Sequence, residues 1–150
     1  MYLVAIIDLY SRFVANWSVS NTIMDAEWCR HTLEQAIATH GKPEVINTDQ
    51  GSQFTSDTFS QCVIDQHIRL SMEGKGRAID NAFIKRAWRS VKYEKLYLDT
   101  PKDGIGLYQS LAQYFRYYNL ERRDSGINNQ ISNQRYTQQF KKAALYRYFR

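Results

Sequence analysis

Short apolar runs alternate with amphipathic segments along most of the chain. Residues Tyr2–Ile7 form a continuous apolar run rich in β-branched residues, which is typical of a buried strand. Residues Phe13–Val19 alternate between apolar and polar side chains, and the turn residues between these two runs predict a hairpin. Two more short runs, 44–48 and 68–72, predict two further strands.

Helical periodicity appears between and after these strands. The first helical segment begins at Thr22, a candidate N-cap, and ends at Gly41. The second covers 56–66, and the third runs from Asp80, a candidate N-cap, to about Leu98. The mixture of a hairpin with crossover units predicts an α/β fold with a mixed sheet.

A last long helix is predicted from Thr100-Pro101, which supply an N-cap and a proline at the first helical position. Its expected buried stripe consists of Ile105, Tyr108, Leu111, Ala112, Phe115 and Tyr118. From Glu121 onward the chain is polar and is expected to be irregular.

Composition narrows the class of protein. A chain of 150 residues with 43% hydrophobic and 23% charged residues fits one globular domain and excludes intrinsic disorder. Cys29 and Cys62 are too few for a disulfide scaffold and are expected to be free thiols. No run of about 20 apolar residues is present, and the apolar start lacks the features of a secretory signal, so we expect a cytoplasmic protein.

One carboxylate stands at a position suited to chemistry. Asp49 directly follows the predicted strand 44–48, and ligands of open α/β sheets bind at the carboxyl ends of strands. Gly51 allows a sharp turn there. The alternative is a structural turn in which Asp49 bonds its own backbone.

Positive charge is concentrated in residues 75–95. This stretch has seven basic residues and two acidic ones, a net charge of +5 that equals the charge of the whole chain. Lys85, Arg89 and Lys92 recur at helical spacing and share one face, which suits a phosphate backbone. The alternative is a solvated helix face. The DNA-binding candidates are Lys75, Arg77, Arg86, Arg89, Lys92 and Lys95.

Several motifs occur together in an order typical of one family. They are Asp8-Leu9-Tyr10-Ser11-Arg12, Thr48-Asp49-Gln50-Gly51-Ser52-Gln53-Phe54, the stretch from Ser71-Met72-Glu73-Gly74-Lys75 to Asp80-Asn81, Trp88-Arg89-Ser90-Val91-Lys92-Tyr93-Glu94, and Tyr117-Tyr118-Asn119 with Arg122. Over residues 2–136 the chain resembles the integrase core domain of bacterial two-reading-frame insertion-sequence transposases, which are relatives of retroviral integrase.

This resemblance implies a ribonuclease-H-like fold, a mixed sheet flanked by helices. It also implies metal-dependent phosphoryl transfer on DNA, in which two aspartates and a glutamate hold two Mg²⁺ or Mn²⁺ ions. It divides the chain into a core over 1–99, a C-terminal helical extension over 100–137, and a basic tail over 138–150. DNA, and other transposase subunits in a homo-oligomer, are the implied partners.

The family's carboxylates match this sequence poorly. Asp49 matches the second aspartate, but Lys85 stands 36 positions later, where the glutamate belongs. The first aspartate is expected in a strand upstream of Tyr2, and Asp8 matches a hairpin-turn aspartate instead. Further departures are Asp124 in place of a histidine, and Ile131-Ser132 in place of Thr-Pro.

These departures predict a disabled metal site. A protonated lysine cannot bind Mg²⁺, so we expect Lys85 to form an ion pair with Asp49 in the vacated site. Glu94 lies nine residues beyond Lys85, on the opposite helix face, and cannot replace the glutamate. Without a first, central strand the sheet would have unpaired edges, and we expect a marginal or oligomeric fold.

Three functional hypotheses remain. The first is an inactive remnant of a transposase core, in which Mg²⁺ or Mn²⁺ is not bound productively. The second is a non-catalytic DNA-binding module, or an inhibitor of a full-length transposase through mixed assembly. The third is an active enzyme whose start is misassigned, against which Lys85 argues.

Overall fold

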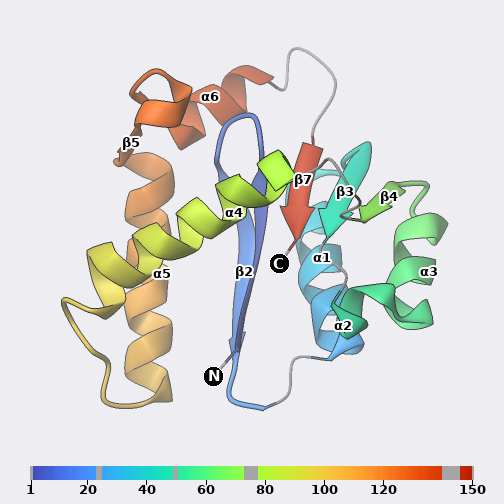
Figure 1. Cartoon of the computed structure of the whole chain (residues 1–150), viewed down its shortest axis with the longest axis horizontal. Coiled ribbons are helices and arrows are strands. Elements are labelled where there is room, and N and C mark those ends of the chain that lie inside the picture. Colours follow the sequence, from blue (N-terminus) through green and yellow to red (C-terminus); the bar gives the residue numbers. More distant parts are fainter. Residues whose placement is uncertain (1, 23–24, 49–50, 73–77, 140–145, 150) are drawn as a thin grey trace.

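The central feature of this computed structural model is a five-stranded mixed sheet (Figure 1). The structure describes residues 2–22, 25–48, 51–72, 78–139 and 146–149, with residues 78–81, 139 and 146–149 described by their backbone alone. The strands are β1 (Tyr2–Asp8), β2 (Val14–Ser20), β3 (Val45–Thr48), β4 (Arg69–Met72) and β7 (Tyr146–Phe149), and they lie in the order β2-β1-β7-β3-β4. The predicted hairpin and the two predicted crossover strands are confirmed.

The middle of the sheet is occupied by a strand from the C-terminal end of the chain. β7 pairs antiparallel with β1, where Ile6 lies opposite Phe149, and parallel with β3, where Val45 lies opposite Tyr146. The expectation that β1 and β3 would each lack a neighbour is therefore wrong. The predicted basic tail supplies the missing neighbour. Any extended segment of suitable length can do so, because strands pair through their backbone N–H and C=O groups.

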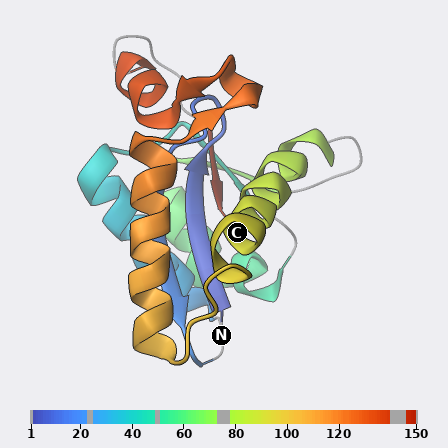
Figure 2. The same cartoon turned by 90° about the vertical axis from the view of Figure 1, so that its left-hand side faces the viewer.

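Helices cover both faces of the sheet. α1 (Ala26–His40), α2 (Ser52–Thr55) and α3 (Asp57–Asp65) lie against one face, and α4 (Ala78–Val91) and α5 (Gly104–Leu120) against the other (Figure 2). A π-helical turn, η1 (Lys92–Leu96), continues α4. No helix in the described part of the chain is long and apolar enough to cross a membrane.

Three predicted helix starts are displaced. α1 is capped by Asp25, whose carboxylate accepts a hydrogen bond from the Trp28 N–H at 2.8 Å, instead of by Thr22. α5 is capped by Asp103, which accepts from the Gly106 N–H at 2.7 Å, so Thr100-Pro101 precede the helix. α4 begins at Ala78, two residues before Asp80. In the first two cases a carboxylate nearer the helix supplies the cap.

The predicted apolar stripe of α5 is only half correct. Leu111, Phe115 and Tyr118 are buried, but Ile105 is 72% exposed and Tyr108 is 55% exposed, although the Tyr108 ring lies 5.2 Å from the Trp17 ring of β2.

The segment after Glu121 is more ordered than predicted. It forms the two-stranded sheet β5 (Arg123–Asp124) and β6 (Gln130–Ile131), the 3₁₀ turn η2 (Ser125–Ile127), and α6 (Ser132–Gln139).

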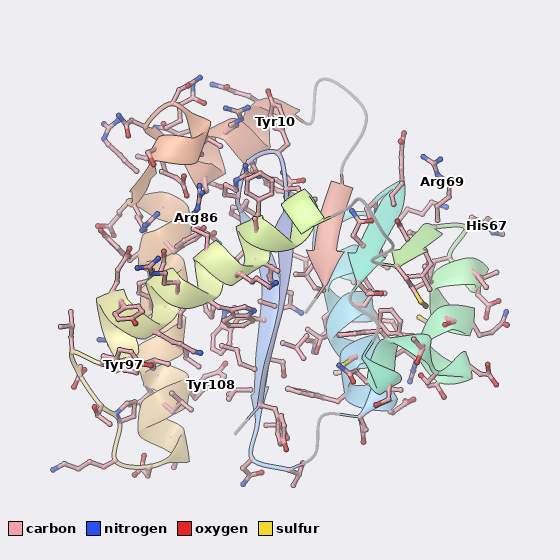
Figure 3. The ribbon with its side chains drawn as sticks, in the orientation of Figure 1. Tyr10, His67, Arg69, Arg86, Tyr97 and Tyr108 are labelled. Atoms are coloured by element: carbon pink, nitrogen blue, oxygen red, sulfur yellow. The ribbon has the colours of Figure 1, made fainter. Side chains whose placement is uncertain are left out.

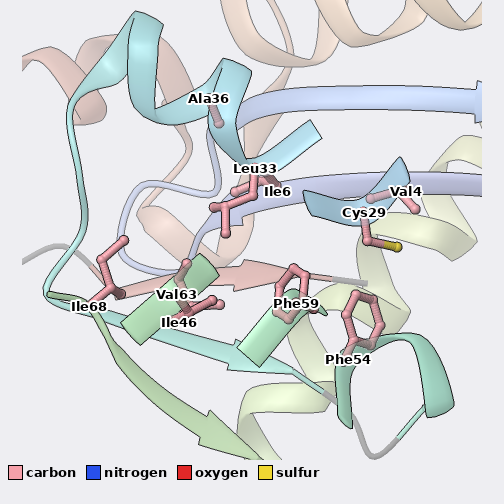
Figure 4. Close-up of a cluster of buried hydrophobic side chains, with 10 residues drawn as sticks. All are labelled: Val4, Ile6, Cys29, Leu33, Ala36, Ile46, Phe54, Phe59, Val63 and Ile68. Atoms are coloured by element: carbon pink, nitrogen blue, oxygen red, sulfur yellow. The ribbon is translucent and has the colours of Figure 1, made fainter. Parts of the chain in front are cut away.

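Alternate side chains of β1 enter two cores. Val4 and Ile6 pack with α1 and α3, around the buried rings of Phe54 and Phe59 (Figure 4). Ala5 and Ile7 pack with α4 and α5 on the other face. β1 is therefore buried on both sides, which explains why its sequence is continuously apolar. Both cysteines are thiols, as predicted; Cys29 is buried and Cys62 is half-buried.

Asn119 joins α5 to the hairpin. Its side-chain oxygen accepts from the Val14 N–H and its amide donates to the Val14 carbonyl, both at 2.9 Å. The side-chain amide of Asn119, in the Tyr117-Tyr118-Asn119 motif, thus forms the pair of hydrogen bonds with Val14 that a residue of a neighbouring strand would form.

We expect Asn119→Ala to lower the free energy of unfolding by about 2 kcal/mol, because it leaves two backbone groups of buried Val14 unpaired. Gln113→Ala, on the exposed side of α5, is the matched control and should change it little. Urea denaturation of both variants checks this, and equal midpoints would contradict the role of Asn119.

Candidate nucleic-acid interface and the catalytic position

α4 presents its basic residues on two different sides. Lys85, Arg89 and Lys92 line a groove of about 700 Å³, as their predicted common face requires. The groove runs along α4 and η1 and is closed by Tyr2 of β1 and by Leu107 of α5. Arg86 points away from this groove and lines a smaller pocket beside β5.

Aromatic side chains accompany the basic ones in this groove. Tyr93 and Tyr97 stand edge to face with ring centroids 5.1 Å apart, and they are 59% and 63% exposed. The Arg89 guanidinium lies 5.6 Å from the centroid of the Tyr93 ring. Guanidinium and ammonium groups can bind phosphates, and exposed aromatic rings beside them can stack on bases.

The remaining predicted DNA-binding residues have different surroundings. Lys95 forms an exposed ion pair with Asp99 at 3.4 Å, so part of its charge is neutralised. Lys75 and Arg77 lie outside the described residues.

An exposed lysine stands at the position of α4 where the resemblance implies a glutamate. Lys85 lines the groove, whereas Asp49 lies outside the described residues, and so does the predicted ion pair between them. Asp8 is fully buried at the end of β1 and accepts hydrogen bonds from the Ser11 N–H and hydroxyl at 3.0 and 2.5 Å. It therefore acts as the hairpin-turn aspartate that the resemblance implied.

Glu94 is occupied by other partners. Arg122 donates to it from Nε at 2.9 Å and from Nη2 at 2.7 Å, and the Tyr114 hydroxyl donates at 2.8 Å. The Arg122 hydrogen bonds lower the pKa of the Glu94 carboxyl, while burial raises the pKa of the Tyr114 hydroxyl. Both carboxylate oxygens of Glu94 thus accept hydrogen bonds that link η1 to α5 and to Arg122, which is a structural role.

This network predicts an acid-sensitive contribution to stability. The pKa of Glu94 is lower in the folded state than in the unfolded state. The carboxylate therefore makes its full contribution to the free energy of unfolding above the ordinary carboxyl pKa of about 4.3, and this contribution is lost as the pH falls through the lowered pKa of the folded state. The free energy of unfolding of the wild type should exceed that of Glu94→Gln by about 1 kcal/mol at pH 7, and this difference should shrink below pH 4. Chemical denaturation at both pH values tests this; a difference that is constant with pH would contradict it.

The described residues do not fit a site for two metal ions. Among them no three His, Cys, Asp or Glu side chains come together in a group that could hold a metal. The central strand, where the resemblance places the first aspartate, is β7 in this structure, and its sequence Tyr-Arg-Tyr-Phe has no acidic residue.

A second basic cluster was missed by the sequence reasoning. Arg12, Arg86, Arg122 and Arg123 line the smaller pocket, of about 190 Å³. Arg12 comes from the hairpin turn, Arg86 from α4, and Arg122 and Arg123 from the chain after α5, so spacing along the chain gives no sign of their proximity. The motif positions Arg12 and Arg122 were the only available signal.

Comparisons of sequence agree with this architecture. Two models of the integrase core domain match residues 1–78 and 66–131. The transposase for insertion sequence element IS904 of Lactococcus lactis is 29% identical over 133 residues, covering 85% of this chain and 51% of the transposase. Transposase InsF for insertion sequence IS3A of Escherichia coli K12 is 33% identical over 96 residues, which cover 63% of this chain and 33% of that transposase. The chain thus spans about half, or less, of the length of these relatives.

Solved structures show the same fold. The catalytic core domain of BIV integrase superposes with a TM-score of 0.75 at 16% identity, covering 93% of this chain and 87% of that one. The HTLV-2 integrase catalytic core domain, solved in complex with magnesium, superposes with a TM-score of 0.66 at 23% identity, covering 86% and 80%. The predicted ribonuclease-H-like arrangement is confirmed.

Proposed function

Because the chain belongs to the integrase core domain family of insertion-sequence transposases, we propose that it is a core that binds DNA but does not catalyse strand transfer. The observation that carries this proposal is the groove along α4. Its basic residues suit a phosphate backbone, yet the same row includes Lys85 at the position of the family's glutamate.

The electrostatics of this groove favour binding over metal chemistry. Lys85, Arg89 and Lys92 are exposed and have no ion-pair partner among the described residues, so their charge is available to a polyanion. The ammonium group of Lys85 would repel a dication at that position. Mg²⁺ or Mn²⁺ would therefore not be held productively, although magnesium is bound in the HTLV-2 integrase core.

A second candidate function is inhibition of a full-length transposase by mixed assembly. It is favoured by an exposed apolar surface at the start of α5 and on the segment before it, where Leu98 is 78% exposed and Ile105 is 72% exposed. Such surfaces commonly mark protein interfaces. The related HTLV-2 core was solved in dimeric and trimeric forms.

Binding of a labelled DNA duplex in EDTA tests the first proposal. Fluorescence anisotropy between 50 and 200 mM NaCl should show metal-independent binding. The logarithm of the association constant should fall with the logarithm of salt at a slope of about −3 or steeper, because at least three phosphates are neutralised. Absence of binding, or binding independent of salt, would contradict it.

A further inference from the structure

The smaller pocket beside α4 holds more positive charge than its own acids neutralise. Four arginines line it: Arg12, Arg86, Arg122 and Arg123. Asp124 lies in the lining, and Glu94 reaches Arg122 from outside it. Four positive charges and two negative ones leave an excess of +2.

The two acids are both used by one arginine. Arg122 binds Glu94 through Nε and Nη2, at 2.9 and 2.7 Å, and it approaches Asp124 through Nη1 at 3.5 Å. Arg123 donates to a neutral group, the Asn129 carbonyl, at 3.0 Å. In the described part of the chain, neither Arg12 nor Arg86 forms an ion pair.

Two arginines that form no ion pair among the described residues stack on aromatic rings. The Arg12 guanidinium lies 3.5 Å from the centroid of the Phe83 ring, and its backbone has a left-handed φ of 64°. Arg135 lies 4.0 Å from the Tyr10 ring centroid at the hairpin turn (Figure 3). Burial lowers the pKa of Arg12; the charge of Asp124 raises it, and the charges of Arg86 and Arg135 lower it.

Like charges fixed at short range destabilise the chain unless an anion joins them. Other groups around the pocket are also suited to an anion, because Ser125 and Asn129 can each donate a hydrogen bond. Planar guanidinium groups match phosphate oxygens well. We propose that this pocket binds one phosphate group of the DNA backbone.

This inference rests on the proposed function and extends it. The groove with Lys85, Arg89 and Lys92 and the pocket with Arg86 lie on two sides of the same helix. α4 therefore presents phosphate-binding groups on both sides, and the duplex contacts the end of α5 as well as α4.

Two variants test the pocket, and one serves as a control. Arg86→Gln removes an exposed guanidinium, and Asn129→Asp adds a negative charge at a left-handed position that aspartate tolerates. Arg116→Gln removes an exposed arginine of α5 that lines neither cavity. Circular dichroism verifies that all three are folded.

In the anisotropy titration described above, Arg86→Gln should weaken DNA binding about fivefold and make the salt slope shallower by about 1. Asn129→Asp should weaken binding at least as much, and Arg116→Gln should leave the slope unchanged. Inorganic phosphate at 10 mM, tested as a competitor at matched ionic strength, should compete only weakly, because it lacks the contacts of the duplex to the groove.

Unchanged binding in both pocket variants, together with weakened binding in Lys92→Glu, would overturn this inference and leave the proposed function intact. Thermal stabilisation of the wild type by phosphate, with DNA binding unaffected in Arg86→Gln, would overturn it in favour of a free-anion site. Absence of any DNA binding by the wild type would overturn both.

Discussion

We expect a chain that ends at Gln139 to lose its cooperative thermal transition. Such a deletion removes β7, which pairs three residues of β1 and four of β3 in the middle of the sheet. Each backbone hydrogen bond contributes about 1 kcal/mol net, and a domain of this size is stable by only about 5–15 kcal/mol. The deletion also exposes the facing edges of β1 and β3, which favours aggregation.

Two further variants separate loss of the strand from loss of charge. Tyr148→Pro keeps the length and charge of the tail but removes a backbone donor from a central strand, so it should also abolish the transition. Deletion of Arg150 alone removes one charge and leaves β7 intact, so the melting temperature should be nearly unchanged. Differential scanning calorimetry distinguishes these results. If the chain that ends at Gln139 melts at the same temperature as the full chain, β7 does not complete the sheet.

The second large effect concerns the groove. We expect simultaneous replacement of Lys85, Arg89 and Lys92 by glutamate to lower affinity for a DNA duplex at least about 100-fold at 100 mM salt. The change removes three phosphate-binding cations and adds three charges that repel phosphate. The salt slope should become shallower by about 3 units.

The matched control has the same change in net charge. It replaces Lys42, Lys102 and Arg116, which are exposed and lie outside the groove, by glutamate. Only nonspecific, long-range electrostatics should change in it, so the affinity should fall by much less. Equal losses of affinity in the two triple variants would show that DNA responds to net charge alone and does not occupy the groove.

Much of the fold follows from patterns within single segments. The strands Tyr2–Asp8 and Val14–Ser20 and the helix capped by Ser56 correspond to periodicities that are visible locally. The common face of Lys85, Arg89 and Lys92 likewise follows from helix geometry alone. The motifs predicted the ribonuclease-H-like arrangement, which the solved integrase cores confirm.

What could not be predicted depends on contacts between distant segments. Tyr146–Phe149 becomes a central strand only because β1 and β3 leave a place for it, and nothing in four aromatic and basic residues identifies that place. The exposure of Ile105 depends on how α5 packs against the hairpin, which periodicity along the chain does not fix. The arginine pocket gathers residues from the hairpin turn, α4, α5, β5 and η2.

The most direct test of a DNA-binding core without catalysis is strand transfer. A labelled oligonucleotide carrying the ends of the parent element would be incubated with the chain and target DNA in Mg²⁺ or Mn²⁺, at concentrations where anisotropy shows the DNA to be bound. We predict bound DNA and no joined product with either metal. Metal-dependent joined product from the chain as it stands would contradict this, and would mean that other carboxylates hold the metal despite Lys85.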